Sequence, residues 1–195
     1  MALPISIEIL KEYKEKDNRI FVDFSTNKGY SMSFFTMLQN VEADIYAFCD
    51  QDDFWMPDKI ERAVNVLQNK NEPTLWFSNI EICDGNLNHI TYGNTTRFYS
   101  FENSLFTCVA PGMSMVFNNS LRKLIIEKDT SNIKDHDFWT YRVASAFGNV
   151  IFDSKPLIKY RRHGNNVSEY SYNSLQRYIL GIKRVLYTDI YKNTK

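Results

Sequence analysis

Cysteine, net charge and long apolar runs are all scarce in this sequence of 195 residues, and each scarcity excludes a class of protein. The three cysteines, Cys49, Cys83 and Cys108, are an odd number without a CxxC pair, which argues against a disulfide framework and a structural zinc site and favours a reducing, cytoplasmic setting. Basic and acidic residues both number 23, so no overall charge attracts nucleic acid. We find no signal-peptide pattern and no apolar run near the roughly 18 residues of a membrane-spanning helix.

Composition and length are those of an ordinary globular protein. Hydrophobic residues make up 44% of the chain and charged residues 24%, while aromatic residues reach 15% and are spread along the whole sequence. A chain of this length can bury one sizeable core. We therefore expect a single domain covering residues 1–195.

Helical periodicity alternates with short β-rich runs along the chain. We expect helices at 5–13, 31–39, 57–67, 120–127 and 136–147 and from 174 onward, and a loop at 92–103. We expect strands at 20–24, 44–49, 74–83, 87–91, 113–117, 150–152 and 157–161. The third helix should begin at Pro57 and bury Ile60, Ala63, Val64 and Leu67, and Asp135 should cap the helix at 136–147. This alternation predicts an α/β domain with a mostly parallel sheet, whose ligands bind beyond the carboxyl ends of strands.

Three carboxylates, Asp50, Asp52 and Asp53, crowd the loop between the predicted strand 44–49 and the helix that follows. Aspartate is common in turns and at helix starts, so capping is one explanation. The other is a divalent cation, which removes the repulsion and prefers hard oxygen ligands. The spacing is not that of an EF-hand, whereas an Asp-x-Asp at a strand end suits magnesium or manganese that also holds substrate phosphates.

Several motifs occur in a consistent order along the chain: Asn-Lys-Gly at 27–29, AFCDQDDFWMPDKI at 47–60, Asp-Gly at 84–85, APGMSM at 110–115, KDHDFW at 134–139 and YRRHGNN at 160–166. Together they resemble family 2 glycosyltransferases of the GT-A fold, especially the rhamnosyltransferase-like members that build bacterial surface polysaccharides. The resemblance covers most of the chain. It implies a GT-A-like (Rossmann-like), mostly parallel sheet flanked by helices, with a metal-loop part of the nucleotide-binding half at 1–70, an acceptor and catalytic half at 71–170 and an amphipathic helix at 171–195.

The resemblance also implies an activity, an inverting transfer of a sugar from a nucleotide-diphosphate sugar to a glycan or lipid-linked acceptor. It makes Asp52 a ligand of Mn²⁺ or Mg²⁺, with Asp50 and His163 as further ligands, and Asp137 the base that accepts the acceptor's proton. The alternative for Asp137 is a helix-start carboxylate. The expected substrate-binding residues are Asp53, Trp55, Gly112, His136, Trp139, Arg161 and Arg162. For the arginine pair a solvated surface is the alternative.

One part of the family pattern is missing from these 195 residues. Such proteins usually open with a strand and a Pro-Thr-Tyr-Asn-like turn, then a helix and a second strand that ends in Asp-Asp-Gly-Ser. We therefore expect an N-terminally truncated fold that lacks much of the nucleotide pocket. A non-catalytic sugar- or metal-binding remnant is the competing interpretation, and a metal-dependent phosphohydrolase is a third, although no second ligand cluster is evident.

The predicted C-terminal helix presents an apolar face with basic residues nearby. That face comprises Leu175, Tyr178, Ile179, Ile182, Val185, Leu186 and Ile190. Packing on its own domain or on a second copy, as a homodimer, is the commoner meaning. The alternative is peripheral contact with an anionic membrane at its cytoplasmic face, which would suit a lipid-linked acceptor.

Overall fold

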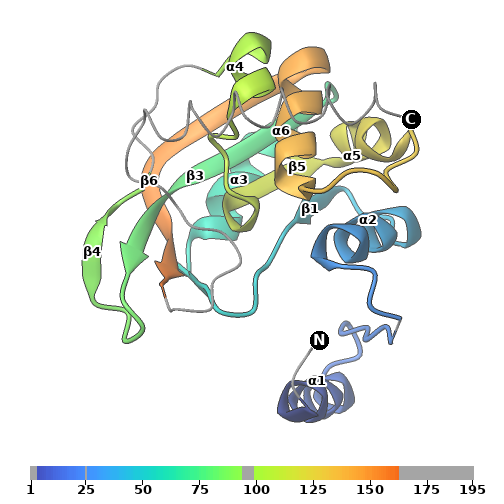
Figure 1. Ribbon diagram of the computed structural model, residues 1–195, viewed down its shortest axis with the longest axis vertical. Helices are drawn as coiled ribbons and strands as arrows, with labels where there is room; N and C mark the ends of the chain where they lie inside the picture. Colours follow the sequence, from blue (N-terminus) through green and yellow to red (C-terminus); the bar gives the residue numbers. More distant parts are fainter. Residues whose placement is uncertain (1–3, 25, 94–98, 163–195) are drawn as a thin grey trace, which may run out of the picture.

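Helices lie on both faces of a six-stranded sheet in the computed structural model, which describes residues 4–24, 26–93 and 99–162 (Figure 1). The helices are α1 (Pro4–Lys16), α2 (Tyr30–Asn40), α3 (Lys59–Leu67), α4 (Phe101–Phe106), α5 (Asn119–Ile126) and α6 (His136–Phe147). The strands are β1 (Ile45–Ala47), β2 (Phe54–Trp55), β3 (Thr74–Cys83), β4 (His89–Tyr92), β5 (Met115–Asn118) and β6 (Asn149–Arg161). A single 3-10 turn, η1 (Gly112–Ser114), precedes β5.

Strand β3 is the centre of the sheet, whose order is β1-β5-β3-β6-β2. One edge of β3 pairs with β6 in parallel from end to end. The other edge is shared, because β5 pairs with its first half and β4 with its last three residues, both antiparallel. Nearly every residue of β3 is buried, as a strand covered on both faces requires.

The predicted α/β class, a Rossmann-like sheet flanked by helices, is confirmed, but the sheet is mixed and not mostly parallel. Of the strand pairs in the described ranges, only β3 and β6 run in the same direction. Alternation of helices and strands does not by itself fix direction. Strand β4 returns beside β3 through the tight turn after Cys83, and β5 enters from the opposite end of the sheet.

The strand directions nevertheless gather three carboxyl ends at one edge of the sheet. Strand β1 is antiparallel to β5, which is antiparallel to β3, so β1 runs in the direction of β3 and β6. The acidic loop follows β1, Asp84 follows β3, and Arg162 follows β6. The expected ligand edge is therefore where the carboxylates lie.

Alternating side chains divide the core between the two faces of the sheet. Leu75 and Phe77 of β3 pack into one cluster with α2, α5 and α6, whereas Trp76 packs into a second cluster with α3. A third cluster near the carboxyl ends holds Ile80, Ile82, Met113, Ile158 and Tyr160. Both helical layers are thus fixed to the strand that positions the site.

The segment at 20–24, predicted as a strand, forms no strand in the structure. Its apolar residues Phe21 and Phe24 are 83% and 61% exposed. β propensity alone cannot form a strand, because its backbone groups need a neighbouring strand to pair with. Figure 1 shows this segment and α1 lying apart from the sheet.

Other boundaries differ in smaller ways. The predicted loop at 92–103 overlaps the start of α4, which Ser100 caps by accepting from the N–H of Asn103. The strands predicted at 150–152 and 157–161 are one strand, β6, with an irregular register opposite Asn79. The third helix begins at Lys59, two residues after Pro57.

Within the described ranges, no helix is both long and apolar enough to cross a membrane. The predicted amphipathic helix at 171–195 and the predicted ligand His163 lie outside those ranges. Membrane contact and homodimer formation through that helix therefore stay predictions.

Candidate active site

The acidic loop leaves the sheet after β1 and returns to it at β2. Phe48, which comes just before the acidic loop, is buried, with 2% of its surface exposed. At the far end, Phe54 and Trp55 pair with Lys159 and Ile158 of β6. The backbone N–H of Arg161 donates to Asp53 Oδ1 at 3.2 Å. Asp53, which directly precedes β2, is thus hydrogen-bonded to the last residue of β6.

Burial and nearby negative charge disfavour the ionised form of two loop carboxylates, Asp53 and Asp50. Burial raises the pKa of Asp53 to about 7, with smaller contributions from Asp52 and Asp50, while the N–H of Arg161 lowers it. The pKa of Asp50 is also raised, first by burial and then by Asp52. Asp53 Oδ2 is buried, with no hydrogen-bond partner among the described residues. A cation would relieve this strain.

The loop fits a metal ion held jointly with a phosphate better than one held by protein alone. Nowhere in the described ranges do three His, Cys, Asp or Glu side chains converge on a possible metal site. Mg²⁺ is commonly bound by one or two carboxylates together with substrate phosphates. Asp50 and Asp52 could supply such a pair, since each oxygen ligand is hard and their repulsion would be neutralised.

A buried lysine stands behind the loop, and sequence reasoning missed it. Lys59 has no exposed surface, and its Nζ lies 3.4 Å from the centroid of the Trp55 ring and donates to the Met113 carbonyl at 2.7 Å. Burial lowers the pKa of Lys59 to about 7. The predicted inward residue Ile60 is 40% exposed. The sequence signal for the burial of Lys59 was its spacing from Ala63 and Leu67, at i, i+4 and i+8, which places all three on one face of α3.

Gly112 allows the η1 turn to lie directly on the start of α6. A Cβ at position 112 would come within 2.9 Å of His136 Nε2 and 3.4 Å of Asp137 Cβ, closer than side-chain packing tolerates. The structure therefore gives Gly112 a packing role. Its predicted contact with an acceptor sugar stays a prediction.

His136 is a buried, neutral imidazole. It is 6% exposed, its ring stacks on Phe34 with centroids 4.2 Å apart, and it meets Phe48 edge-on at 4.7 Å. Burial lowers the pKa of His136 to about 4. Neither ring nitrogen has a hydrogen-bond partner in the described part of the chain.

Asp137 follows at the first turn of α6, and its carboxyl group has the properties of a base. Its Oδ1 accepts from the N–H of Phe138 at 2.7 Å. Burial raises the pKa of Asp137 to about 6, Asp135 adds to the rise, and the N–H groups of Phe138 and Gly112 lower it. Asp137 can therefore hold or release a proton close to neutral pH.

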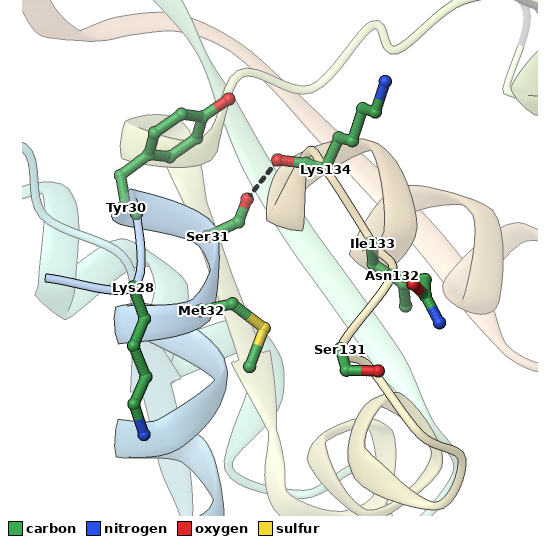
Figure 2. A pocket seen from close by; sticks show the side chains of 9 residues that line it. Lys28, Tyr30, Ser31, Met32, Ser131, Asn132, Ile133 and Lys134 are labelled. Carbon is green, nitrogen blue, oxygen red and sulfur yellow. Dashed lines mark hydrogen bonds between the residues drawn. The ribbon is translucent and has the colours of Figure 1, made fainter.

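The cap of α6 comes from another helix, so the prediction for Asp135 was wrong. The carboxylate of Asp135 makes no capping hydrogen bond and instead accepts from the Tyr30 hydroxyl at 2.9 Å. Ser31 Oγ accepts from the N–H of His136 at 2.8 Å and donates to the Lys134 carbonyl at 2.6 Å. Figure 2 shows this contact across a shallow pocket between α2 and residues 131–134. The first turn of α2 thereby positions α6.

The remaining predicted residues divide into two groups. Arg161 ends β6 beside the acidic loop and Arg162 follows it, with the N–H of Arg162 donating to the Cys83 carbonyl at 2.9 Å. Trp139 is not brought to the loop, because its ring packs against the main core and its Nε1 donates to the Ile125 carbonyl at 3.0 Å. The structure thus brings together the acidic loop, Trp55, Gly112, His136 and Asp137.

Comparison with known proteins shows that the chain is similar to glycosyltransferases. The family model described as glycosyl transferase family 2 matches residues 5–125. An uncharacterized glycosyltransferase of Methanocaldococcus jannaschii is 29% identical over 162 residues, which cover 79% of this chain and 54% of that protein. The dTDP-rhamnosyl transferase RfbG of Shigella flexneri is 28% identical over 156 residues, covering 73% and 53%. The chain spans about half the length of these curated relatives.

Proposed function

The chain belongs to glycosyltransferase family 2, and on that premise we propose that it carries the transfer site of an inverting, metal-dependent glycosyltransferase. The donor is a nucleotide-diphosphate sugar, and the acceptor is a glycan or lipid-linked saccharide in bacterial surface polysaccharide synthesis. The mixed sheet with helices on both faces is consistent with the GT-A-like fold of this family. The observation that carries the proposal is Asp137, a half-buried carboxyl group with a pKa of about 6 beside Gly112.

Asp137 acts on the acceptor. Its carboxylate takes the proton of the acceptor hydroxyl while that oxygen bonds to the anomeric carbon and the bond from that carbon to the diphosphate oxygen breaks. Attack opposite the leaving group inverts the anomeric configuration. A base with a pKa near 6 is mostly ionised at pH 7 and still basic enough to accept the proton. The N–H of Phe138 fixes the orientation of the carboxylate.

Asp50 and Asp52 act on the donor. They would hold Mn²⁺ or Mg²⁺, with His163 as the predicted third ligand, and a bound ion neutralises charge that develops on the departing diphosphate. Arg161, the last residue of β6, and Arg162, which follows it, lie at the same edge and would add positive charge there. In this proposal Asp53 and Trp55 shape the pocket for the transferred sugar.

The relatives suggest which donor to test first. RfbG is named as a dTDP-rhamnosyl transferase, so dTDP-rhamnose heads the set of candidates. UDP- and GDP-sugars complete it. The 28% identity does not decide among them.

A non-catalytic sugar- or metal-binding role is the second candidate. The observation in favour of a role without catalysis is that, across the described ranges, no three potential ligands converge on one metal site, so these residues do not by themselves build the metal centre that transfer would need. Such a protein would bind without releasing nucleotide.

Calorimetry on the 195-residue chain separates these candidates. UDP, GDP and dTDP are titrated with and without Mn²⁺, and nucleotide release is then measured from the matching sugars. We expect Mn²⁺-dependent binding of one nucleotide, lost in Asp52→Ala, and release from its sugar. Binding without release supports the second candidate. A folded chain that binds none of the three nucleotides contradicts the transferase.

A further inference from the structure

We propose that Lys59 is a positioning residue that links the acidic loop to the turn beside Asp137, an inference that rests on the proposed function. Lys59 begins α3 directly after the loop and is completely buried. A buried charge is costly unless it is well compensated, so its retention needs a specific reason. The reason lies in what its two contacts join.

The first contact is with the loop side of the site. Lys59 Nζ sits 3.4 Å from the centroid of the Trp55 ring, a cation–π arrangement in a water-poor position. Trp55 in turn is paired with β6. In the described ranges Lys59 forms no ion pair with a carboxylate, although Asp50 and Asp53 influence it through space. The ring face therefore fixes one side of the ammonium group.

The second contact is with the base side of the site. The same ammonium group donates to the Met113 carbonyl at 2.7 Å. Met113 belongs to η1, which is closed by the N–H and the hydroxyl of Ser114 donating to the Pro111 carbonyl at 2.9 and 2.7 Å. Lys59 thus holds a closed turn and not a single flexible residue.

The turn passes this constraint to Asp137 through Gly112. Gly112 lies close enough to α6 that no side chain fits between them, and its N–H lowers the pKa of Asp137. A continuous chain of contacts therefore runs from Trp55 through Lys59 and the turn to Asp137. Its consequence is that Lys59 sets the position of the base relative to the acidic loop.

Arg122 provides a matched control for a buried cation. It is 6% exposed, donates to the carbonyls of Leu38 and Gln39 at 2.7 and 3.2 Å, and lies 5.8 Å from the Tyr46 ring. Like Lys59, it is a buried cation that donates to backbone carbonyls and lies near an aromatic ring, although it also lies 4.0 Å from Glu42 Oε1. The carbonyls that it contacts are in the last turn of α2, away from the acidic loop and η1. Loss of Arg122 tests destabilisation alone.

The test is a side-chain ¹³C NMR titration of Asp137 in the ligand-free chain, with the signal assigned through Asp137→Asn. We expect Lys59→Met to raise the titration midpoint of Asp137, because the η1 turn, whose Gly112 N–H favours the ionised form, is no longer held against the start of α6. The neighbouring groups Asp135 and His136 are unchanged by the substitution. Arg122→Met should lower the unfolding temperature and leave the midpoint in place.

A wild-type midpoint in folded Lys59→Met would overturn the proposal, as would an equal shift in Arg122→Met. If Lys59→Met does not fold, Trp55→Leu removes the other contact of the same ammonium group, and the same midpoint decides. The titration needs no nucleotide. A chain that shows the shift but binds no nucleotide would contradict the proposed function and retain the link made by Lys59.

Discussion

The start of α6 and the acidic loop lie at the same end of the sheet, but they differ in how far contacts with other elements fix their side chains. At α6, Ser31 caps the helix, His136 is packed between aromatic rings, and Asp137 accepts from a backbone N–H. In the loop, burial raises the pKa values of Asp50 and Asp53, and Asp53 Oδ2 is buried without a partner in the described ranges.

This difference suggests a division of labour. Groups that act in the transition state work best when folding has already fixed them, because no reorganisation is then needed during the reaction. Repulsion in the loop would instead be relieved by a bound cation. Changes at α6 should therefore affect turnover more than binding, and changes in the loop should affect binding.

The largest expected effect separates turnover from binding at α6. Asp137→Asn should lower the rate of nucleotide release from the donor sugar by about 10²–10⁴-fold, since the amide cannot accept the proton. The affinity for Mn²⁺ and nucleotide should stay at the wild-type value. Asp135→Asn, two residues earlier on the same turn, is the control and should retain activity. If Asp137→Asn retained most of its activity, Asp137 would not be the base.

A smaller effect is expected when the cap of α6 is removed. Ser31→Ala leaves the N–H of His136 without its acceptor, and the free energy of unfolding should fall by about 1 kcal/mol. Urea unfolding measures the change. Ser33→Ala is the matched control, because Ser33 is exposed on the same helix and should change stability by less than about 0.5 kcal/mol. Equal losses in both variants would mean that α2 does not position α6.

The smallest effect is a change in pH dependence in the loop. The pKa of Asp53 is about 7 in the folded chain against an ordinary 3.8, so the folded state keeps a proton that the unfolded state has lost between these values. Its contribution to stability therefore falls as pH rises from about 4 to 7. Asp53→Asn removes this pH-dependent loss of stability. The unfolding temperature of the variant, relative to that of the wild type, should therefore rise between pH 5 and pH 7.5.

The lowered pKa of His136, about 4, has the opposite effect, because its contribution to stability increases as pH rises. His136 is present in both proteins, so this contribution cancels in the comparison. Asp58→Asn is a control of opposite sign. The hydrogen bond from Lys155 lowers the pKa of Asp58, so ionised Asp58 stabilises the wild type. The unfolding temperature of Asp58→Asn, relative to that of the wild type, should therefore fall as pH rises through the range in which carboxyl groups ionise. A constant difference between Asp53→Asn and the wild type at all pH values would contradict the buried, proton-holding Asp53.

Local sequence signals recovered much of the fold. The strand predicted at 74–83 is β3 to the residue, and α2 and α6 begin within one residue of their predicted starts. Family membership, predicted from ordered motifs, is confirmed by the family match. The acidic loop was predicted from carboxylates crowded at a strand end and Asp137 from the family resemblance, and the roles of both stay predictions.

The features that were missed depend on contacts between distant parts of the chain. Ser31 and His136 are 105 residues apart, so no local pattern could show that one caps the other. Lys59 was missed because a lysine is usually assigned to solvent, and only the ring of Trp55 and the carbonyl of Met113 explain its burial. The direction of a strand also depends on which strands lie beside it, and local sequence does not show this. The expectation of a mostly parallel sheet was therefore wrong.

The claim that the acidic loop and Asp137 form one site can be measured by paramagnetic broadening. The ¹³C signal of the Asp137 side chain is recorded with Mn²⁺ and dTDP, or with UDP or GDP if calorimetry selects one of those, and again with diamagnetic Mg²⁺. The account predicts that the signal broadens with Mn²⁺, stays sharp with Mg²⁺, and stays sharp with Mn²⁺ in Asp52→Ala. A sharp Asp137 signal in wild-type protein saturated with Mn²⁺ and nucleotide would contradict it.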